Sequence, residues 1–153
     1  MSEKNGKLIA VWGAPHSGKT SFAASLATAI ADTYASATVI VLHSDIEAPM
    51  LSVLFPSAKS GSLGSVGIPL SANELDTEQI LADCTEAKAR PTLAVIGYRD
   101  GDTRLTYPRY GKERAVELFE KLKSLSDFVI VDCMSNPNES LLSLAALETA
   151  SQT

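Results

Sequence analysis

One octapeptide constrains the fold of this chain more than any other feature. Residues 13–20 read Gly-Ala-Pro-His-Ser-Gly-Lys-Thr and match the pattern G-x-x-x-x-G-K-[ST] at every fixed position. Residues 8–12 before it are apolar, and apolar side chains recur at helical spacing after it up to Tyr34. This order predicts a buried strand, a glycine loop and a helix, as in a phosphate-binding loop; an ordinary Gly- and Ser-containing loop is the alternative.

Each fixed position of the octapeptide has a chemical task. The two glycines let backbone N–H groups turn toward phosphate oxygens, and the helix that follows adds its positive N-terminal dipole. Lys19 brings positive charge to the β- and γ-phosphates, and the Thr20 hydroxyl is a ligand for Mg²⁺. At His16 only the backbone is required. The predicted nucleotide-binding residues are Gly13, Ala14, Pro15, His16, Ser17, Gly18, Lys19, Thr20 and Ser21.

Two carboxylates at strand ends supply the rest of the predicted chemistry. Asp132 follows the apolar run 128–131, and such a residue reaches the Mg²⁺ that Thr20 holds on its other side. Asp45 follows the apolar run 38–42 and is our candidate for orienting the attacking water; a loop aspartate that caps a turn is the alternative. We therefore predict Lys19 and Asp45 as catalytic residues and Thr20 and Asp132 as metal ligands. His43 is expected to be a hydrogen-bonded strand-end residue rather than a ligand.

Strands and helices are expected to alternate along the whole chain. Apolar runs predict strands over residues 8–12, 38–42, 92–96 and 128–132, with loops over 57–70 and 98–112. Helical spacing predicts helices from the phosphate loop to Tyr34, over 50–55 and 76–89, from Lys112 to about Ser126, and over 137–150. This alternation predicts an α/β fold with a mainly parallel sheet between two helical layers. We expect residues 1–153 to form a single nucleotide-binding domain.

The composition narrows the partners that this chain is expected to have. The net charge is −5 at pH 7, which argues against broad attraction to nucleic acid or anionic membranes, so we expect DNA or membrane association only indirectly. Cys84 and Cys133 have neither metal-site nor disulfide-framework spacing and are predicted to be small core residues. No apolar run approaches the length of a signal-peptide core or a membrane span, so a cytoplasmic location is expected.

The stretch over residues 98–114 mixes cations with aromatic rings. A protein or dimer surface and a solvated loop are both compatible with such a mixture, and its acidic residues weaken a simple DNA-binding interpretation. The residues concerned are Arg99, Arg104, Arg109, Lys112 and Arg114, interleaved with Tyr98, Tyr107 and Tyr110.

These motifs, in this order, resemble the ParA/MinD partitioning ATPases over essentially the whole chain. Residues 13–20 stand for the Walker A loop, residues 43–45 for the D-x-D motif, and residues 129–133 for the Walker B strand. Residues 11–20 and 97–101 look closest to ParA-like ATPases of Gram-positive bacteria, some of them encoded near conjugation or pilus genes. The resemblance implies a P-loop fold, ATP and Mg²⁺ as cofactors, slow hydrolysis that serves as a switch, and a nucleotide-dependent homodimer.

The sequence departs from the family's pattern at four points. Ala14 replaces the signature lysine, His43 replaces the first Asp of D-x-D, and Met134-Ser135 stands where prolines follow Walker B. Family members are also longer, so the chain looks truncated at its C-terminus, with no strand expected after the last helix. Ala14 and His43 favour a second hypothesis, a nucleotide-binding regulatory module without hydrolysis. A third hypothesis is a P-loop small-molecule kinase with residues 98–114 as a lid. ATP and GTP stay open alternatives, because no N/T-K-x-D base-recognition motif occurs.

Overall fold

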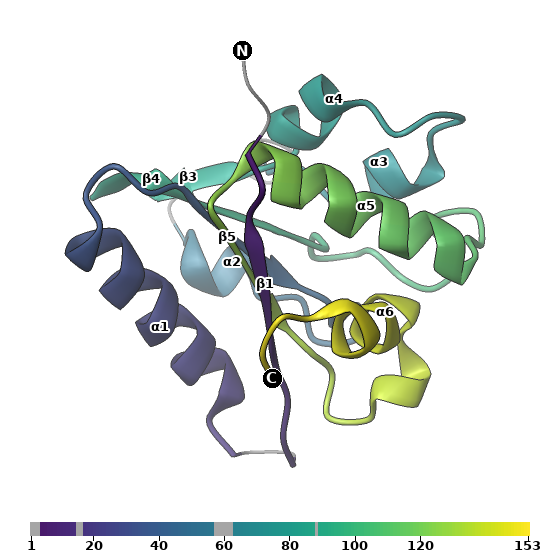
Figure 1. Ribbon diagram of the computed structural model, residues 1–153. Helices are drawn as coiled ribbons and strands as arrows, with labels where there is room; N and C mark the ends of the chain where they lie inside the picture. Colours follow the sequence, from purple (N-terminus) through teal and green to yellow (C-terminus); the bar gives the residue numbers. More distant parts are fainter. Residues whose placement is uncertain (1–3, 15–16, 57–62, 88) are drawn as a thin grey trace.

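The computed structural model describes residues 4–14, 17–56, 63–87 and 89–153 (Figure 1). Its centre is a five-stranded sheet in the order β1-β5-β2-β4-β3. Four strands are parallel, as predicted, and the short edge strand β3 runs antiparallel to β4. The strands are β1 Lys7–Val11, β2 Val39–His43, β3 Thr85–Ala87, β4 Arg90–Gly97 and β5 Phe128–Asp132.

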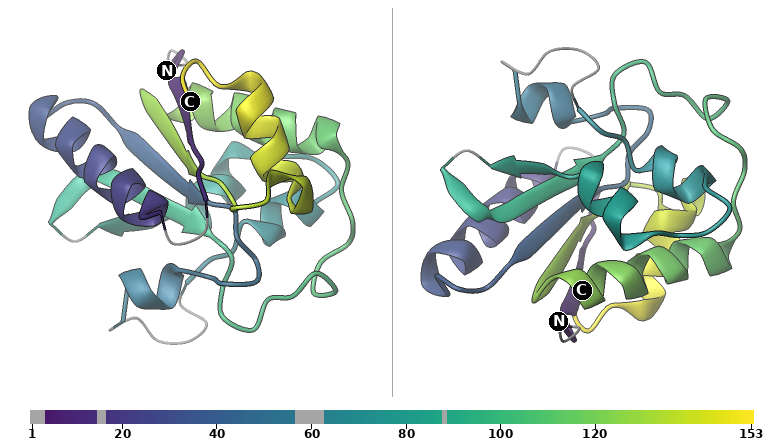
Figure 2. Two further views of the ribbon diagram at one scale, coloured as in Figure 1. Left: turned by 90° about the horizontal axis from the view of Figure 1, so that it is seen from below. Right: turned by 90° about the horizontal axis from the view of Figure 1, so that it is seen from above.

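Helices cover both faces of this sheet and form the predicted three layers (Figures 1 and 2). Helix α1, Lys19–Thr33, lies on one face together with the short α2, Leu51–Leu54. The other face carries α5, Lys112–Leu125, which packs against α6, Leu141–Thr149. The remaining short helices are α3 Gly67–Ser71, α4 Thr77–Ala82 and the 3₁₀ turn η1 Pro137–Glu139.

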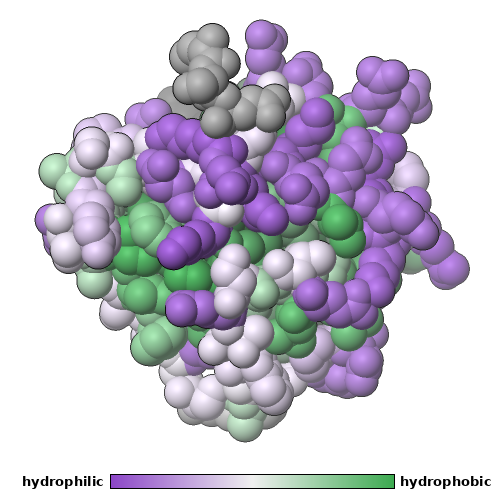
Figure 3. Space-filling model, in the orientation of Figure 1, coloured by the Kyte–Doolittle hydropathy of each residue, from purple (hydrophilic) through white to green (hydrophobic). Residues whose placement is uncertain are grey.

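Strands β2 and β5 are apolar up to their last residue because both of their faces are buried. In β2, Ile40 and Leu42 belong to the core beneath α5 and α6, whereas Val39 and Val41 belong to the core beneath α1. Helix α5 shows the opposite, one-sided pattern. Its side chains at helical spacing are buried, and hydrophilic ones cover its outer surface in Figure 3. The buried set in α5 is Ala115, Leu118, Phe119 and Leu122.

The region between β2 and β4 differs from its sequence prediction. The helix expected over 76–89 begins at its predicted cap, where Asp76 accepts a hydrogen bond from the Glu78 N–H, but it ends at Ala82. Residues beyond it form β3, because pairing with β4 satisfies their backbone groups along the sheet edge. Part of the loop expected over 57–70 is helical, since α3 begins at Gly67. Residues 57–62 lie outside the described part of the chain.

The last residues of the chain run along β1. After α6, Gln152 forms a parallel bridge with Ile9, and its carbonyl accepts the Ala10 N–H at 2.9 Å. No strand was expected after the last helix, and one paired residue is found there. In the ranges that the structure describes, no helix combines the length and the apolar character that crossing a membrane requires.

Candidate functional site

Strand order and register bring the predicted site residues to one edge of the sheet. Val11 of β1 is paired with Asp132 of β5, and Asp132 is paired with His43 of β2. The phosphate loop leaves β1 at this edge and enters α1 at Lys19. Gly18, directly before the helix, has φ +82°, a left-handed conformation in which any other residue would be strained. Pro15 and His16, two of the predicted binding residues, lie outside the described residues.

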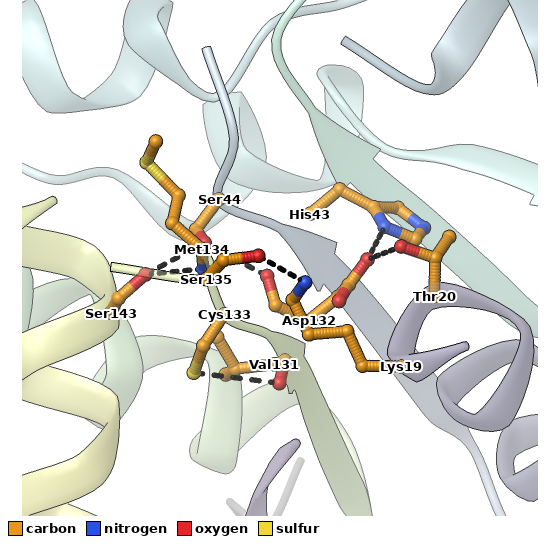
Figure 4. Close-up of polar contacts among 10 residues, drawn as sticks. All are labelled: Lys19, Thr20, His43, Ser44, Val131, Asp132, Cys133, Met134, Ser135 and Ser143. Atoms are coloured by element: carbon orange, nitrogen blue, oxygen red, sulfur yellow. Dashed lines mark hydrogen bonds and ion pairs between the residues drawn. The ribbon is translucent and has the colours of Figure 1, made fainter. Parts of the chain in front are cut away.

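Three of the predicted residues converge at the start of α1 (Figure 4). The Thr20 hydroxyl donates a hydrogen bond to Asp132 Oδ2 at 2.7 Å. Lys19 Nζ donates a hydrogen bond to Oγ of Ser135, three residues after Asp132, at 2.6 Å. Residues separated by 112 positions in the chain thus form one polar cluster, as their places at strand ends predict.

The carboxyl group of Asp132 has one oxygen without a protein partner. Asp132 is 6% exposed, and among the described residues its buried Oδ1 has no hydrogen-bond partner, whereas Oδ2 accepts two. A buried carboxylate oxygen without a partner costs free energy, so this atom calls for a cation or a water molecule.

The residues present fit Mg²⁺ better than they fit a transition metal. No group of three or more His, Cys, Asp and Glu side chains in the described ranges could hold a metal ion by itself. Mg²⁺ is commonly held by one or two protein oxygens together with phosphate oxygens and water. Thr20 and Asp132 are such a pair, with Oδ1 of Asp132 as the available oxygen.

His43 is the site residue whose partner the sequence did not reveal. It is 3% exposed, and its Nδ1 lies 2.9 Å from Asp132 Oδ2. Because a carboxylate oxygen can only accept, Nδ1 carries the proton in this contact. The prediction of a hydrogen-bonded strand-end residue is confirmed. The signal for its partner was present in the sequence, since His43 and Asp132 each end an apolar strand, but the pairing of those strands was not known.

A chain of hydrogen bonds extends from Asp132 toward α6. Ser44 Oγ donates to the carbonyl oxygen of Asp132 at 2.8 Å and lies 2.9 Å from Ser143 Oγ. The Met134 N–H donates to the same Ser143 hydroxyl at 3.0 Å. The backbone after β5 is therefore held by hydrogen bonds from Asp132 to the first turn of α6 (Figure 4).

Neither cysteine has the character of a reactive thiol. Burial raises the pKa of Cys133 to about 12, and burial also raises the pKa of Cys84 to about 12. Both side chains stay protonated at neutral pH and behave as small apolar groups. Cys133 is buried, which confirms the expected core position, and Cys84 is half-buried.

Asp45 lies just beyond β2 and closes a turn. Its Oδ1 accepts the backbone N–H groups of Glu47 at 2.8 Å and Ala48 at 3.0 Å. This is the capping geometry that was the alternative to a catalytic role. The part of Asp45 in positioning water stays a prediction.

The stretch over residues 98–114 is largely exposed, but it is anchored to the fold at Asp102. Asp102 is buried, and its Oδ2 accepts hydrogen bonds from Ser65 Oγ at 2.7 Å and from the Arg99 N–H at 2.9 Å. The Tyr107 hydroxyl donates to the same carboxylate at 3.2 Å. The tip of the stretch remains in water, and Leu105 there is 94% exposed.

The architecture matches solved structures, although the sequence alone matches none of the family models and none of the curated proteins. A ParA family ATPase from Chlorobium tepidum superposes with a TM-score of 0.74 at 16% identity, over 94% of this chain and 57% of that one. The cell division ATPase MinD of Pyrococcus furiosus gives 0.69 at 18% identity, over 95% and 56%. The septum site-determining protein MinD of Pyrococcus horikoshii, complexed with Mg-ADP, gives 0.68 at 17% identity, over 94% and 54%.

This chain has the fold of these ATPases. It spans a little over half the length of each of the three structures. The likeness supports the predicted α/β class.

Proposed function

We propose that this chain is a P-loop ATPase of the ParA/MinD type that binds ATP with Mg²⁺ and hydrolyses it slowly as a switch. One observation carries the proposal: Thr20 bonds to Asp132, whose Oδ1 has no hydrogen-bond partner among the described residues, and Lys19 bonds to the nearby Ser135. The shared fold supports it, because the neighbouring structures are ATPases of this type. Partitioning, positioning, or conjugation- and pilus-related assembly is the proposed biological setting.

The chain's own residues divide the work at the triphosphate. Backbone N–H groups at the start of α1 would bind phosphate oxygens. Lys19 would exchange its contact with Ser135 for the β- and γ-phosphates and donate its protons there. Thr20 Oγ1 and Asp132 Oδ1 would hold Mg²⁺, which when bound offsets the negative charge of the phosphates. Asp45 would orient a water molecule for in-line attack on the γ-phosphorus, and the bond from that phosphorus to the ADP oxygen would break.

The proposed switch lies in the backbone that follows β5. When Lys19 turns to the phosphates, Ser135 loses its present hydrogen-bond donor. Residues 132–135 would then differ between the nucleotide-bound and nucleotide-free states. This difference would control the formation of a nucleotide-dependent homodimer or the binding of a protein partner that contacts residues 98–114.

A second candidate is a nucleotide-binding module with little turnover. The capping contacts of Asp45 favour it, because an aspartate held by two backbone N–H groups is less free to orient water. Ala14 favours it as well, since the signature lysine of the resembled family is missing. A small-molecule kinase, the third hypothesis, would be recognised by phosphoryl transfer to an acceptor in excess of phosphate release.

Calorimetric titration with ATP and GTP, with and without Mg²⁺, tests the proposal. We expect Mg²⁺-dependent binding that Lys19→Ala abolishes while the circular dichroism spectrum stays unchanged. Lys121→Ala, which removes an equal charge from α5, is the matched control and should bind as the wild type does. Undiminished binding by Lys19→Ala would refute the phosphate-loop assignment. Phosphate release, measured on the same samples, separates the switch from the non-hydrolysing module.

A further inference from the structure

A second cavity opens at the same edge of the sheet, next to the phosphate site. Its volume is about 380 Å³, within the range of small-molecule sites. Among its lining residues, Ser44 and Tyr98 directly follow β2 and β4, and Met134 lies two residues after β5. None of the described phosphate-loop residues lines it. The carboxyl ends of parallel strands are where α/β proteins bind ligands, so the position favours a second binding site.

The outer wall of the cavity is held in place by buried contacts. Tyr107 lines the cavity, and its hydroxyl bonds to buried Asp102 while accepting a hydrogen bond from Arg99 Nη2 at 3.1 Å. Gly67 lies under the Tyr107 ring, and a Cβ at this position would overlap the ring. These contacts anchor the wall at Tyr107, so this side of the cavity has a defined shape.

The residues that line the cavity indicate which type of ligand it would bind. Its inner surface is apolar and aromatic, with Ile46, Leu70, Leu141, Tyr98 and Tyr110 among the lining residues. An aromatic ring suits such a surface, because ring edges and faces pack favourably against tyrosines.

Two arginines at the rim add a preference for negative charge. Arg104 is already engaged, since it pairs with Glu47 at 3.2 Å and donates to the Glu139 carbonyl at 2.9 Å. Arg109 also lines the cavity and is exposed, and in the part of the chain that the structure describes it forms no ion pair. A ligand that places a carboxylate at Arg109 would satisfy it with a charge-assisted hydrogen bond.

Residues 132–135 connect this cavity to the phosphate site. Asp132 and Ser135 contact Thr20 and Lys19. Met134, between them, lines the cavity. Ser44 lines it too, and its hydroxyl holds the carbonyl oxygen of Asp132. A ligand in the cavity would therefore contact Met134, inside the four-residue segment that the nucleotide would rearrange. Figure 4 shows the contacts of this segment with Lys19, Thr20 and Ser143.

We propose that this cavity is an effector site for an aromatic carboxylate and that its occupancy is coupled to nucleotide binding. The coupling, but not the cavity itself, rests on the proposed function above. Coupling between two sites is reciprocal, so nucleotide and effector must change each other's affinity by the same factor, about 5- to 150-fold when the coupling is of typical size. The aromatic carboxylate can be a free metabolite or an aromatic residue next to an acidic one on a protein partner.

The first experiment is an NMR titration of the nucleotide-free protein with phenylacetate. We expect a dissociation constant on the order of 1 mM, as for a ligand of this size, with shifts centred on Ser44, Tyr98 and Met134. Phenylacetamide, which has the same shape without the charge, should bind about two- to fivefold more weakly. Equal affinity for acid and amide, or shifts elsewhere on the surface, would overturn the proposal.

Variants at the rim test the role of Arg109. Arg109→Ala should lower phenylacetate affinity about two- to fivefold and leave phenylacetamide affinity unchanged, whereas Arg109→Lys should keep the preference for the acid. Lys7→Ala removes one exposed positive charge at the opposite end of β1 and should change neither affinity. A loss of acid preference in Lys7→Ala as large as in Arg109→Ala would show a general charge effect and contradict the site.

Two further measurements distinguish the source of the carboxylate and test the coupling to nucleotide binding. Acetyl-Phe-Asp-amide presents the same chemistry from a peptide. If this peptide binds more tightly than phenylacetate, the cavity is assigned to a protein partner.

Phenylacetate at saturation should change the affinity of the protein for Mg-ATP, and Mg-ATP should change its affinity for phenylacetate by an equal factor. If ATP does not bind, the proposed function fails, while the nucleotide-free titration still decides the cavity. If both bind with no mutual effect, the coupling is wrong.

Discussion

His43 offers a direct test of the proposed metal site, because its imidazole contacts one oxygen of Asp132 and leaves the other free of it. Nδ1 donates to Oδ2, and the Thr20 hydroxyl donates to the same oxygen, which leaves Oδ1 for the cation. His43→Ala removes the larger and more rigid of these two donors. The carboxylate then has one donor in place of two and is free to rotate.

The size of the effect follows from the contact that is lost. A hydrogen bond to a charged group contributes about 1.5–3 kcal/mol, which corresponds to roughly 10- to 150-fold in an equilibrium constant. Partners that orient a metal ligand typically change metal affinity about 10- to 100-fold when removed. We therefore expect His43→Ala to raise the Mg²⁺ concentration required for half-maximal ATP binding about 10- to 100-fold. His43→Asn should recover most of this loss, because the Asn amide N–H can take the place of Nδ1–H.

The assay is ATP affinity measured by calorimetry across a Mg²⁺ series, with affinity in EDTA as the reference. A general loss of packing at the buried His43 would lower affinity in EDTA as well and would lower the melting temperature of both variants. An orienting role moves only the Mg²⁺ dependence. If His43→Ala showed the wild-type Mg²⁺ midpoint, or if His43→Asn were as impaired as His43→Ala, the assignment of His43 as the residue that positions Asp132 would be wrong.

Two further predictions concern Asp45 and Gly67. Asp45→Ala should slow phosphate release with little change in ATP affinity if Asp45 orients water; normal turnover, measured against the wild type, would leave it as the cap of the Glu47–Ala48 turn alone. Gly67→Ala should destabilise the fold by about 1–3 kcal/mol, because the new Cβ displaces the Tyr107 ring. Urea denaturation should show this as a lower midpoint at an unchanged m-value, and an unaltered midpoint would mean that the wall of the cavity is not fixed as described.

The parts of the fold that the sequence predicted are those set by local pattern. The run before the phosphate loop, the loop itself and α1 follow one another directly, so hydrophobic periodicity and one motif are sufficient. The meeting of Thr20 with Asp132 was also predictable. Asp132 ends β5, Thr20 follows the loop that leaves the carboxyl end of β1, and the carboxyl ends of parallel strands lie on the same side of the sheet.

The parts that the sequence did not predict depend on contacts between distant residues. Strand β3 is three residues long, and the spacing of Cys84 and Ala87 fits a helix, so only its pairing with β4 decides the outcome. Asp102 looks like a solvated loop residue until Ser65, 37 positions earlier, donates to it. The partner of His43 lies 89 positions away and requires β2 and β5 to be neighbours in register.

Two of the departures from the resembled family, His43 and Ser135, have a similar consequence in the structure. Where that family has an aspartate, His43 places a donor beside Asp132, so the site holds one carboxylate instead of two close ones that would repel each other. Ser135, where a proline is expected, gives Lys19 a neutral hydroxyl partner. A hydrogen bond between the charged Lys19 and a neutral hydroxyl contributes about 1.5–3 kcal/mol. It can be exchanged for several charge-assisted contacts with a triphosphate, whereas an ion pair at the same place would oppose nucleotide binding more strongly. Both replacements therefore leave Lys19 and Asp132 available for a nucleotide and its cation, which is why we expect binding to persist even if turnover is weak.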